Sequence, residues 1–595
     1  MLNVHRSRSS SAVLEKMFST ALASYIASSL ATAIGPLVDG VIVGSYYSVD
    51  SVAAIGLTSF LLVGYRTLTA SILSKGSHVI ASERIGKGDK EGANRVFSVT
   101  LLLTIAFSVV LSLLSIVFSE QIAVFTGARS ALADLMIPAS DYLKGYCVGL
   151  PFFALLFVLT PFLQMDGDYN LVTLSSVVMT IVDIAADLFV VNVTKGGLFQ
   201  IGLATSVGHL AAFLVVASHF VFKKTHFHFS WKEIRLSEFR DILITGMPVG
   251  VVKLSNMFCG ILINQMLAVS FTSGVVAALG VGNQLFKLCF FLWLGPAYTL
   301  MSFASLFFGE EDRKALRDIQ EISIRKGLLL TCCAAAAVFA FAVPLAYVFI
   351  RNGDDQIRKM TADAIRFIAL SMPLNVFIYG FQQYLIGAGR KLFANIFSFI
   401  LDFGIPVPLT MLFLAVLGYR GAWISKPVIN AAVILAAVIY ILHQKGTDFR
   451  EKALLLNDNF DTAPGHELYI EADSMFDIMG ISRVSIAFIM ENGFNKQDAN
   501  KVSLAIEELA GNIVQHGFMD GRHHHVYIRI LVKGDEMILR LRDDCRPFDP
   551  VEKYRTELML DNDPENGIAI KMMMRMCKEI KYNRIYGMNN LIIHV

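Results

Sequence analysis

The sequence predicts an all-α polytopic membrane protein of about twelve transmembrane helices, followed by a small C-terminal α/β sandwich domain. Two observations support this prediction. Up to Gln444 the chain consists of long apolar runs with short polar breaks, whereas from Gly446 onward charged residues recur every few positions. Of the 595 residues, 55% are hydrophobic and only 17% are charged, although about a quarter of a typical soluble protein is charged. The chain therefore divides into a lipid-embedded part and an aqueous part.

The apolar part contains twelve stretches that are long enough to cross a bilayer. A spanning helix needs about 20 residues because the hydrocarbon core is about 30 Å thick. The first six stretches are Phe18–Tyr46, Val52–Leu73, Val96–Val117, Tyr142–Leu163, Leu171–Val193 and Ile201–Phe222. The second six are Ile242–Val269, Val276–Phe308, Leu328–Phe349, Ile365–Ile386, Phe393–Leu417 and Ala422–Leu442. The predicted domains are an N-terminal lobe (1–222), a linker (223–241), a C-terminal lobe (242–445), a second linker (446–464) and a soluble domain (465–595).

Lys and Arg residues gather in the loops that follow the second, sixth and eighth predicted spans, where Lys75, Lys223 and Arg313 are examples. The loops on the other side are poorer in them, except for the loop between the ninth and tenth spans. Because basic loops stay in the cytoplasm, both termini and the soluble domain are expected to be cytoplasmic, in a multi-pass protein of the plasma (inner) membrane. No basic tract long enough to bind nucleic acid is present, so the expected partners are membrane lipid and a small-molecule substrate.

The apolar part contains an internal repeat. A polar loop that begins at Gly86 follows the second span, and a similar loop that begins 223 positions later, at Gly309, follows the eighth. Gly167 after the fourth span and Gly389 after the tenth are 222 positions apart. Each unit has six spans, an even number, so the two units insert in the same orientation. Parallel repeats of this kind place a substrate path between two lobes that can rock.

Three acidic residues lie inside the first six predicted spans, where a charge costs several kcal/mol and therefore suggests function. Asp39 is in the first span, and Asp183 and Asp187 are in the fifth. The i, i+4 spacing of the latter two places both carboxylates on one helix face. Protonation of one carboxylate, or a cation bound between them, would relieve their repulsion. A carrier coupled to H⁺ or Na⁺ needs such an arrangement, whereas the alternative is that these residues are solvated near helix ends.

Other charged side chains also occur in or near the spans. Arg66 and Lys287 are expected to extend their charged ends toward the membrane surface. Lys253 and Asp402 are candidates for lining a cavity of the second lobe.

Several motifs resemble those of the multidrug and toxic compound extrusion (MATE) family over roughly residues 12–445. They are Leu37–Gly44, Ser51–Leu57, Gly86–Ala93, Asp183–Phe189 and Gly246–Pro248. The resemblance implies an ion-coupled (H⁺ or Na⁺) antiporter that exports small organic or cationic compounds, and it assigns Asp39, Asp183 and Asp187 to the cation-binding site. The family usually has asparagine at the position of Asp183, so this chain carries an additional carboxylate there.

The charged C-terminal part shows the pattern of an α/β sandwich. Helical spacing of apolar residues runs from Asp473 to Asn492, and a second helix begins at Asp498. Strands are predicted at Val526–Val532, Met537–Asp543 and Leu591–Val595, and a Met-rich helix after Asn566. The three histidines at 523–525 are expected to be exposed rather than to bind a metal.

Two motifs in this part resemble the GHKL ATPase superfamily, which includes anti-sigma-factor serine kinases and histidine kinases. Glu508–His516 is similar to its E-x-x-x-N box, and Arg542–Pro550 to its adenine loop. The resemblance implies Mg-ATP as cofactor, with Asn512 as a ligand of Mg²⁺ and Glu508 as catalytic base. It also implies that Asp543 accepts a hydrogen bond from the adenine amino group, and that Gly567 allows the backbone to approach the phosphates.

The adenine loop departs from the GHKL pattern at two positions. Cys545 and Pro547 replace glycines, and proline removes an N–H and fixes φ. Two activities therefore stay open for this domain. They are nucleotide binding and, beyond it, phosphoryl transfer.

Three functions remain open. The first is an ion-coupled exporter with a cytoplasmic nucleotide-binding regulatory domain, driven by the ion gradient because no Walker-type loop is present. The second is a membrane-anchored signalling protein whose C-terminal domain is a serine kinase or a sequestering switch for an anti-anti-sigma-type partner. The third is a flippase for a lipid-linked precursor, which requires basic residues in the central cavity, and Lys253 is the one good candidate in the sequence.

Overall fold

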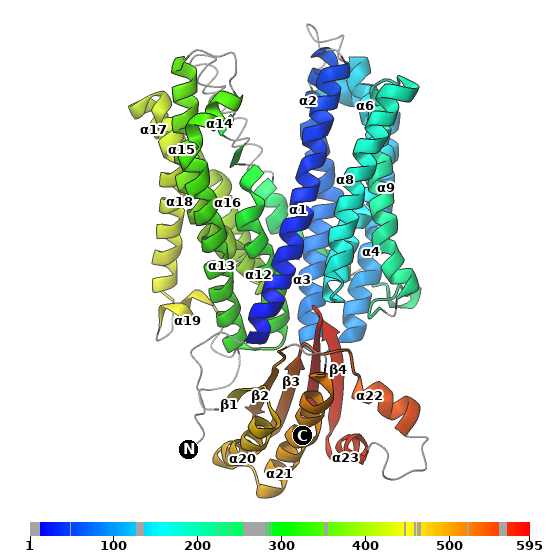
Figure 1. Ribbon diagram of the computed structural model, residues 1–595, viewed down its shortest axis with the longest axis vertical. Coiled ribbons are helices and arrows are strands. Elements are labelled where there is room, and N and C mark those ends of the chain that lie inside the picture. The colour runs from blue at the N-terminus through cyan, green and yellow to red at the C-terminus, as the bar shows by residue number, and fades with distance from the viewer. Residues whose placement is uncertain are drawn as a thin grey trace.

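The computed structural model describes the chain apart from residues 1–11, 48, 127–135, 224, 236, 254–280, 283–284, 287, 350–354, 445–447, 457–459, 461–465, 520–522 and 559–567. The molecule consists of a long helical bundle and a small domain with a sheet, which lies against one end of the bundle (Figure 1). We call the end of the bundle next to this domain the domain-side end.

The N-terminal half of the bundle consists of nine described helices. They are α1 (Ala12–Tyr46), α2 (Val49–Arg66), α3 (Ile72–Gly86), α4 (Lys90–Val117), α5 (Ser119–Thr126), α6 (Met136–Val148), α7 (Leu150–Met165), α8 (Tyr169–Phe189) and α9 (Leu198–Phe222). The second predicted span is α2 and α3 joined by a π-helical turn, and α3 continues to Gly86. Lys75, assigned to a loop from the sequence, therefore lies inside a helix.

The C-terminal half begins with a helix at 237–253. The other described helices are α12 (Phe291–Gly309), α13 (Arg313–Ala340), α14 (Ala342–Phe349), α15 (Asp355–Gly387), α16 (Lys391–Phe399), α17 (Pro406–Leu417) and α18 (Tyr419–Leu442). Within the described residues, eight helices are long and apolar enough to cross a membrane, or nine if α6 and α7, bent by 46°, form one span. Much of the predicted span Ile242–Val269 falls outside the described residues.

The two lobes meet closely at the domain-side end, where α3 crosses α12. A Cβ atom on Gly86 would lie 2.3 Å from the carbonyl oxygen of Leu306, and one on Gly309 would lie 2.1 Å from that of Glu83. Only glycine permits this approach of two backbones. Gly86 and Gly309 are equivalent positions of the repeat, as are Glu83 and Leu306, so the crossing is nearly two-fold symmetric. Toward the other end the lobes spread apart (Figure 1).

The C-terminal domain is a five-stranded antiparallel sheet with helices on one face. The strands are β1 (Glu467–Ala472), β2 (Val526–Lys533), β3 (Glu536–Asp543), β4 (Glu579–Ile585) and β5 (Met588–His594), in the order β1-β2-β3-β5-β4. The helices are α20 (Met475–Glu491), α21 (Lys496–Ala505), α22 (Pro550–Lys553) and α23 (Ile568–Met576), and α19 (Phe449–Ala453) precedes the domain. The predicted strands in β2 and β3 are confirmed to within one residue, whereas β1 and β4 were not predicted.

The two faces of this sheet differ because side chains alternate along a strand. On β2, Val526, Ile528 and Ile530 belong to the domain's own core, together with residues of α20, α21 and α23. The residues between them point to the other face, which lies on the helical bundle. Arg529 of β2 is one of these, and only 1% of its surface is exposed. This second face therefore carries charged side chains into a buried interface.

Candidate functional site

The first candidate site is the cluster of carboxylates in the N-terminal lobe. Asp39 on α1 and Asp183 on α8 line one cavity of about 620 Å³, and Asp187 is fully buried one turn further along α8. Gly35 of α1 lies next to Asp183, since a Cβ atom on Gly35 would be in van der Waals contact, at 3.6 Å, with a carboxylate oxygen of Asp183. Each of the three carboxylates has a buried oxygen without a hydrogen-bond partner among the described residues. The structure thus brings these predicted residues together.

We call this space the distal cavity, because it lies away from the C-terminal domain. Arg66 also lines it, and its Nε donates a hydrogen bond of 2.7 Å to the hydroxyl of Tyr146. The guanidinium lies over the rings of Tyr146 and Phe153. The prediction that Arg66 extends toward the membrane surface is therefore wrong, because these aromatic partners hold it inside the lobe. Lys287 lies outside the described residues.

A second cavity, of about 320 Å³, lies between the lobes and next to the C-terminal domain. We call it the proximal cavity. It shares Ser71, Phe157 and Lys253 with the distal cavity, so the two adjoin. Lys253 was predicted to line a cavity, and it does so in both. Lys75 and Tyr586 also line the proximal cavity, and neither role was foreseen from the sequence.

Tyr586 belongs to the C-terminal domain, at the tip of the hairpin between β4 and β5. Its hydroxyl lies 2.9 Å from Nε2 of His78 and 2.6 Å from Oγ of Ser82, both on α3. The same hydroxyl donates a hydrogen bond of 3.2 Å to the carbonyl of Ser302 on α12. The backbone N–H of Tyr586 donates to the carbonyl of Met165 at 2.6 Å. One side chain of the soluble domain therefore contacts both lobes at once.

The turn that presents Tyr586 has an uncommon conformation. Tyr586 has φ 53° and Gly587 has φ 83°, which makes a two-residue turn with both residues in the left-handed region. Asn-Gly is the usual sequence for such a turn, and an aromatic residue at positive φ is an outlier. The surrounding contacts hold it there, since Ile585 and Met588 pack in one core with residues of the bundle. Strained residues of this kind occur where position matters for function.

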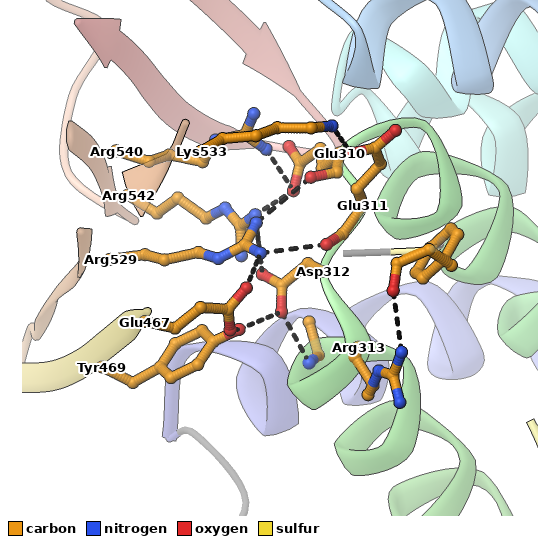
Figure 2. Close-up of polar contacts among 12 residues, drawn as sticks. Glu310, Glu311, Asp312, Arg313, Glu467, Tyr469, Arg529, Lys533, Arg540 and Arg542 are labelled. Carbon is orange, nitrogen blue, oxygen red and sulfur yellow. Dashed lines mark hydrogen bonds and ion pairs between the residues drawn. The ribbon is translucent and has the colours of Figure 1, made fainter. Parts of the chain in front are cut away.

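A buried charge cluster forms the second contact between the domain and the bundle (Figure 2). Glu310 and Asp312 come from the loop between α12 and α13, and Arg540 and Arg542 come from β3. Arg540 lies 2.8 Å from Glu310, and Arg542 pairs with Glu310 and lies 3.3 Å from Asp312. Arg529 of β2 donates to the carbonyl of Glu310 at 3.1 Å. Burial lowers the pKa of Arg540 and of Arg542 to about 9, which leaves both protonated at neutral pH.

The periphery of the interface reaches both lobes. Lys533 lies 2.5 Å from Glu311 of the C-terminal lobe. Lys16 of α1 forms an ion pair with Asp544 of the domain. Asn583 of β4 donates a hydrogen bond of 3.5 Å to the carbonyl of Ile85 on α3. The hairpin around Tyr586 and the charge cluster around Glu310 together form what we call the clamp.

The predicted nucleotide residues that the structure describes are Asp543 on β3 and, on a helix, Glu508 and Asn512. Asp543, at the end of β3, is 3% exposed, and burial raises the pKa of its carboxyl group. Glu508 and Asn512 lie on the helix that follows α21, which winds as π-helix at Ile506–Ala510 and at Ile513–Gly517 instead of the predicted regular α-helix. Such π segments are frequent at functional sites. Gly567 lies outside the described residues.

Close packing joins this helix to the adenine loop. A Cβ atom on Gly517 would lie 2.8 Å from Sγ of Cys545, so the end of the Asn512 helix touches the residue that replaces the first loop glycine. His524 is buried rather than exposed as predicted, because its Nδ1 lies 2.8 Å from a carboxylate oxygen of Asp544. The ligand atoms of His524, Asp544 and Cys545 lie within 4.8 Å of one another.

The adenine loop is bonded directly to the clamp hairpin. Asn589 of β5 donates a hydrogen bond of 2.7 Å to the carboxylate of Asp543 and one of 3.1 Å to the carbonyl of Arg546. Arg584 of β4 donates to the carbonyl of Cys545 at 3.2 Å. Arg584 and Asn589 flank the turn at Tyr586. A change at Asp543 can therefore reach the hairpin tip through two side chains.

A two-lobe helical repeat with buried carboxylates in one lobe defines a multi-pass membrane transporter, here joined to an ATPase-like domain. Residues 25–189 and 248–412 both match MatE, and residues 478–594 match the histidine kinase-like ATPase domain. The two MatE matches begin 223 residues apart, which confirms the predicted repeat. Because they cover more than half of the chain, this protein belongs to the MatE family.

Relatives match the helical part of the chain. The probable multidrug resistance protein YoeA of Bacillus subtilis (strain 168) is 23% identical over 434 residues, which cover 70% of this chain and 90% of YoeA. The multidrug export protein MepA of Staphylococcus aureus (strain NCTC 8325 / PS 47) is 23% identical over 389 residues, or 63% of this chain and 83% of MepA. An outward-facing structure of a multidrug resistance MATE family transporter superposes with a TM-score of 0.67 at 21% identity, covering 71% of this chain and 94% of that one.

Proposed function

We propose that this protein is an ion-coupled exporter of small organic compounds, and that its cytoplasmic C-terminal domain binds nucleotide and holds the transporter closed. The observation that carries the regulatory part is Tyr586, which enters the bundle from the soluble domain and contacts α3 and α12 together. The curated relatives, named as multidrug proteins, support the transport part.

Export would be driven by an ion gradient through Asp39, Asp183 and Asp187. Asp183 and Asp187 are buried, and Asp39 has one buried carboxylate oxygen, so H⁺ or Na⁺ binding would offset their mutual repulsion. Cation binding and substrate binding would favour opposite-facing states, which is how one gradient moves another solute.

The proposed closure of the transporter by the C-terminal domain is based on where the domain contacts the two lobes. For loading from the cytoplasm, α3 and α12 must separate at the domain-side end, where Gly86 and Gly309 now bring them into backbone contact. The clamp bonds to both helices only while they are close, so it stabilises the state that is closed at this end. A domain shifts such an equilibrium by as much as its contacts differ between the two states.

Nucleotide would weaken the clamp. The donor set fits Mg-ATP, with Asn512 offering an amide oxygen to Mg²⁺, Glu508 a carboxylate nearby, and Asp543 a buried acceptor for adenine. One oxygen of Asp543 already accepts from Asn589 and from the backbone N–H of Cys545. An adenine amino group would compete with Asn589 for this carboxylate and so disturb the strand that carries the hairpin.

Reconstituted vesicles test this proposal. Release of two dyes, one an organic cation and one an organic anion, is followed with and without an ion gradient, and with and without Mg-ATP or a non-hydrolysable analogue. We expect at least one dye to move only with the gradient, and both nucleotides to accelerate it. Transport that requires hydrolysis, or that ignores the gradient, would overturn the proposal. Nucleotide-dependent phosphorylation of a partner with no effect on transport would favour the signalling alternative instead.

A further inference from the structure

We propose that the exported compound is an organic anion that binds between Lys75 and Lys253 in the proximal cavity. This inference rests on the proposed export function and names its substrate class. Lys75 lies on α3 of the N-terminal lobe, and Lys253 lies on helix 237–253 of the C-terminal lobe. The two ammonium groups therefore enter one space from opposite lobes.

Each lysine is held inside the bundle by a neutral partner. Nζ of Lys75 lies 3.9 Å from the centroid of the Tyr298 ring, and Nζ of Lys253 donates a hydrogen bond of 2.5 Å to the hydroxyl of Ser71. A ring face and a hydroxyl orient an ammonium group but do not neutralise it. A buried ammonium without a counter-charge costs several kcal/mol, so a bound anion would be strongly favoured here.

The charge of the proximal cavity is one-sided. Its described lining residues include two lysines and His78 but no Asp or Glu. Residues 254–280, which the structure does not describe, contain no Asp or Glu in the sequence, so this stretch cannot supply a counter-charge. The buried carboxylates Asp39 and Asp183 line the distal cavity, where Arg66 accompanies them. Of the two cavities, the proximal one is therefore the cavity whose described lining has basic side chains and no carboxylate.

The rest of the lining fits the head group and the body of an organic anion. The buried hydroxyl of Ser28 has no hydrogen-bond partner among the described residues, so it can donate to a carboxylate, sulfonate or phosphate oxygen. Other lining hydroxyls, such as those of Ser74 and Thr160, donate to backbone carbonyls. Tyr25, Phe157, Tyr298 and Phe303 provide aromatic surface for an apolar body. A volume of about 320 Å³ suits one small organic molecule. From the sequence, small organic or cationic compounds were the expected substrates, and Lys253 was the one basic residue expected in the central cavity. The structure places two lysines there, Lys75 and Lys253.

An anion at this place would also affect the lobes. Lys75 and Lys253 carry like charges on opposite lobes, and their repulsion opposes the close approach of α3 to the C-terminal lobe. A bound anion removes this repulsion. Substrate would then favour closure of the lobes around itself, directly above the hydroxyl of Tyr586.

Binding of two related xanthene dyes to the purified full-length protein tests the inference. Fluorescein is an anion and rhodamine 6G is a cation, and fluorescence anisotropy measures the affinity of each without any ion gradient. We expect fluorescein to bind, and Lys75→Met and Lys253→Met each to weaken its binding roughly tenfold or more, as for loss of a hydrogen bond to a charged group. Lys75→Arg should retain binding, which separates charge from folding.

Lys426→Met is the matched control, because Lys426 lies over the ring of Phe286 on the C-terminal lobe and lines neither cavity. It should leave fluorescein binding unchanged. Competition with benzoate, phenyl phosphate and farnesyl phosphate then distinguishes a soluble anion from a lipid-linked phosphate.

Two results would overturn the inference. One is fluorescein binding that does not depend on either lysine, and the other is tight rhodamine 6G binding with no fluorescein binding. Lysine-dependent fluorescein binding without gradient-driven transport would instead contradict the proposed export function and leave the anion site standing.

Discussion

Asp39 and Asp187 are the residues at which the proposed ion coupling can be tested most directly. Both carry buried carboxylate oxygens without a hydrogen-bond partner among the described residues. Asp39 lines the distal cavity, whereas Asp187 is fully buried beneath it. A carboxylate in such a place must gain a proton or a cation at some step of the cycle, because a permanent unpaired charge there is too costly.

We predict that Asp39→Asn and Asp187→Asn each reduce gradient-driven dye efflux from vesicles to the level of empty vesicles. An amide keeps the size of the side chain but can neither bind a proton nor attract a cation in the same way. Asp141→Asn is the control, because that carboxylate is 43% exposed and pairs with Lys144. Normal efflux by both buried variants would remove these residues from the coupling mechanism.

The nucleotide residues make separate predictions for binding and for chemistry. In calorimetry on the full-length protein, Asn512→Ala and Asp543→Asn should weaken Mg-ATP binding by about 1–3 kcal/mol, the cost of losing a buried polar contact. Glu508→Gln should retain binding and abolish any transfer of labelled phosphate, because a base contributes to the reaction more than to binding. The control is Asp535→Asn in the exposed turn between β2 and β3. If wild-type protein shows no heat at millimolar Mg-ATP, the domain acts through protein contacts alone.

A functional residue could be predicted from the sequence only where the neighbouring residues in the chain make it stand out. Asp39 and Asp183 stand out as charges in apolar runs, so sequence alone found them. Lys75 was missed because helix α3 continues through a polar stretch, which places an apparent loop lysine in a cavity. Tyr586 contacts Ser82 across 504 positions, and no local pattern announces such a contact. Its one local signal is Tyr-Gly at a turn where Asn-Gly is usual.

At the scale of elements, the β4–β5 hairpin is the part of the ATPase-like domain that packs against both transporter lobes. The sequence predicted the last strand but not β4, whose alternation of charged and apolar residues is weak. The hairpin is buried on both sides of its tip, with Ile585 at 0% and Met588 at 1% exposure. It therefore packs as part of the bundle, although it belongs to the sheet.

We predict that Tyr586→Phe raises nucleotide-free efflux. The variant removes the hydroxyl that binds His78, Ser82 and Ser302, and leaving such buried groups unpaired costs about 1–3 kcal/mol, or roughly five- to a hundredfold in the clamping equilibrium. Dye affinity measured in parallel shows whether the proximal cavity is intact. Tyr347→Phe, on an exposed position of α14, is the control. Unchanged efflux at unchanged dye affinity would argue against a clamp.

The loop between α12 and α13 makes a second prediction for the clamp. Glu310→Gln leaves Arg540 and Arg542 buried without their shared carboxylate, and breaking a buried ion pair in this way costs about 3–5 kcal/mol. We expect faster amide hydrogen exchange in β2 and β3, and faster proteolysis of the linker that precedes the C-terminal domain. Glu311→Gln should change little, because Glu311 is 39% exposed and pairs with the half-exposed Lys533. Equal protection in both variants would show that the cluster does not hold the domain.

At the scale of the whole molecule, a membrane transporter and an ATPase-like domain share one interface. The clamp contacts the helices that the repeat makes equivalent, α3 and α12. Leu454, the residue after α19, holds the segment before the domain to the C-terminal lobe, because its carbonyl accepts a hydrogen bond of 2.8 Å from the hydroxyl of Tyr384. The repeat and both domains were predictable, because hydropathy and motifs report them. The contact between the helical bundle and the C-terminal domain was not predictable, because the hydropathy and the motifs of each part are explained by that part alone.

We predict that a reporter fused after Val595 reports the cytoplasm. The basic loops require this orientation, and the domain is fixed to the same end of the bundle as those loops. Nucleotide binding by the domain also requires it, because ATP is abundant there. A labelled reporter tests it in intact cells, with a fusion after Phe118 at the opposite end of α4 as the contrasting position. Labelling of the Val595 fusion from outside would reverse the orientation.

The clamp and the lobes it holds are covalently joined, which fixes their ratio at one to one in every molecule. Closure is then an intramolecular equilibrium governed by an effective concentration, of order millimolar for a short connection, that neither dilution nor expression level can change. A detached copy of the domain would need to approach that concentration to compete. Under the proposed clamping, making more of the protein would add transporter lobes and clamping domains together, so ligands of the lobes or of the domain, and not gene dosage, would change the open fraction.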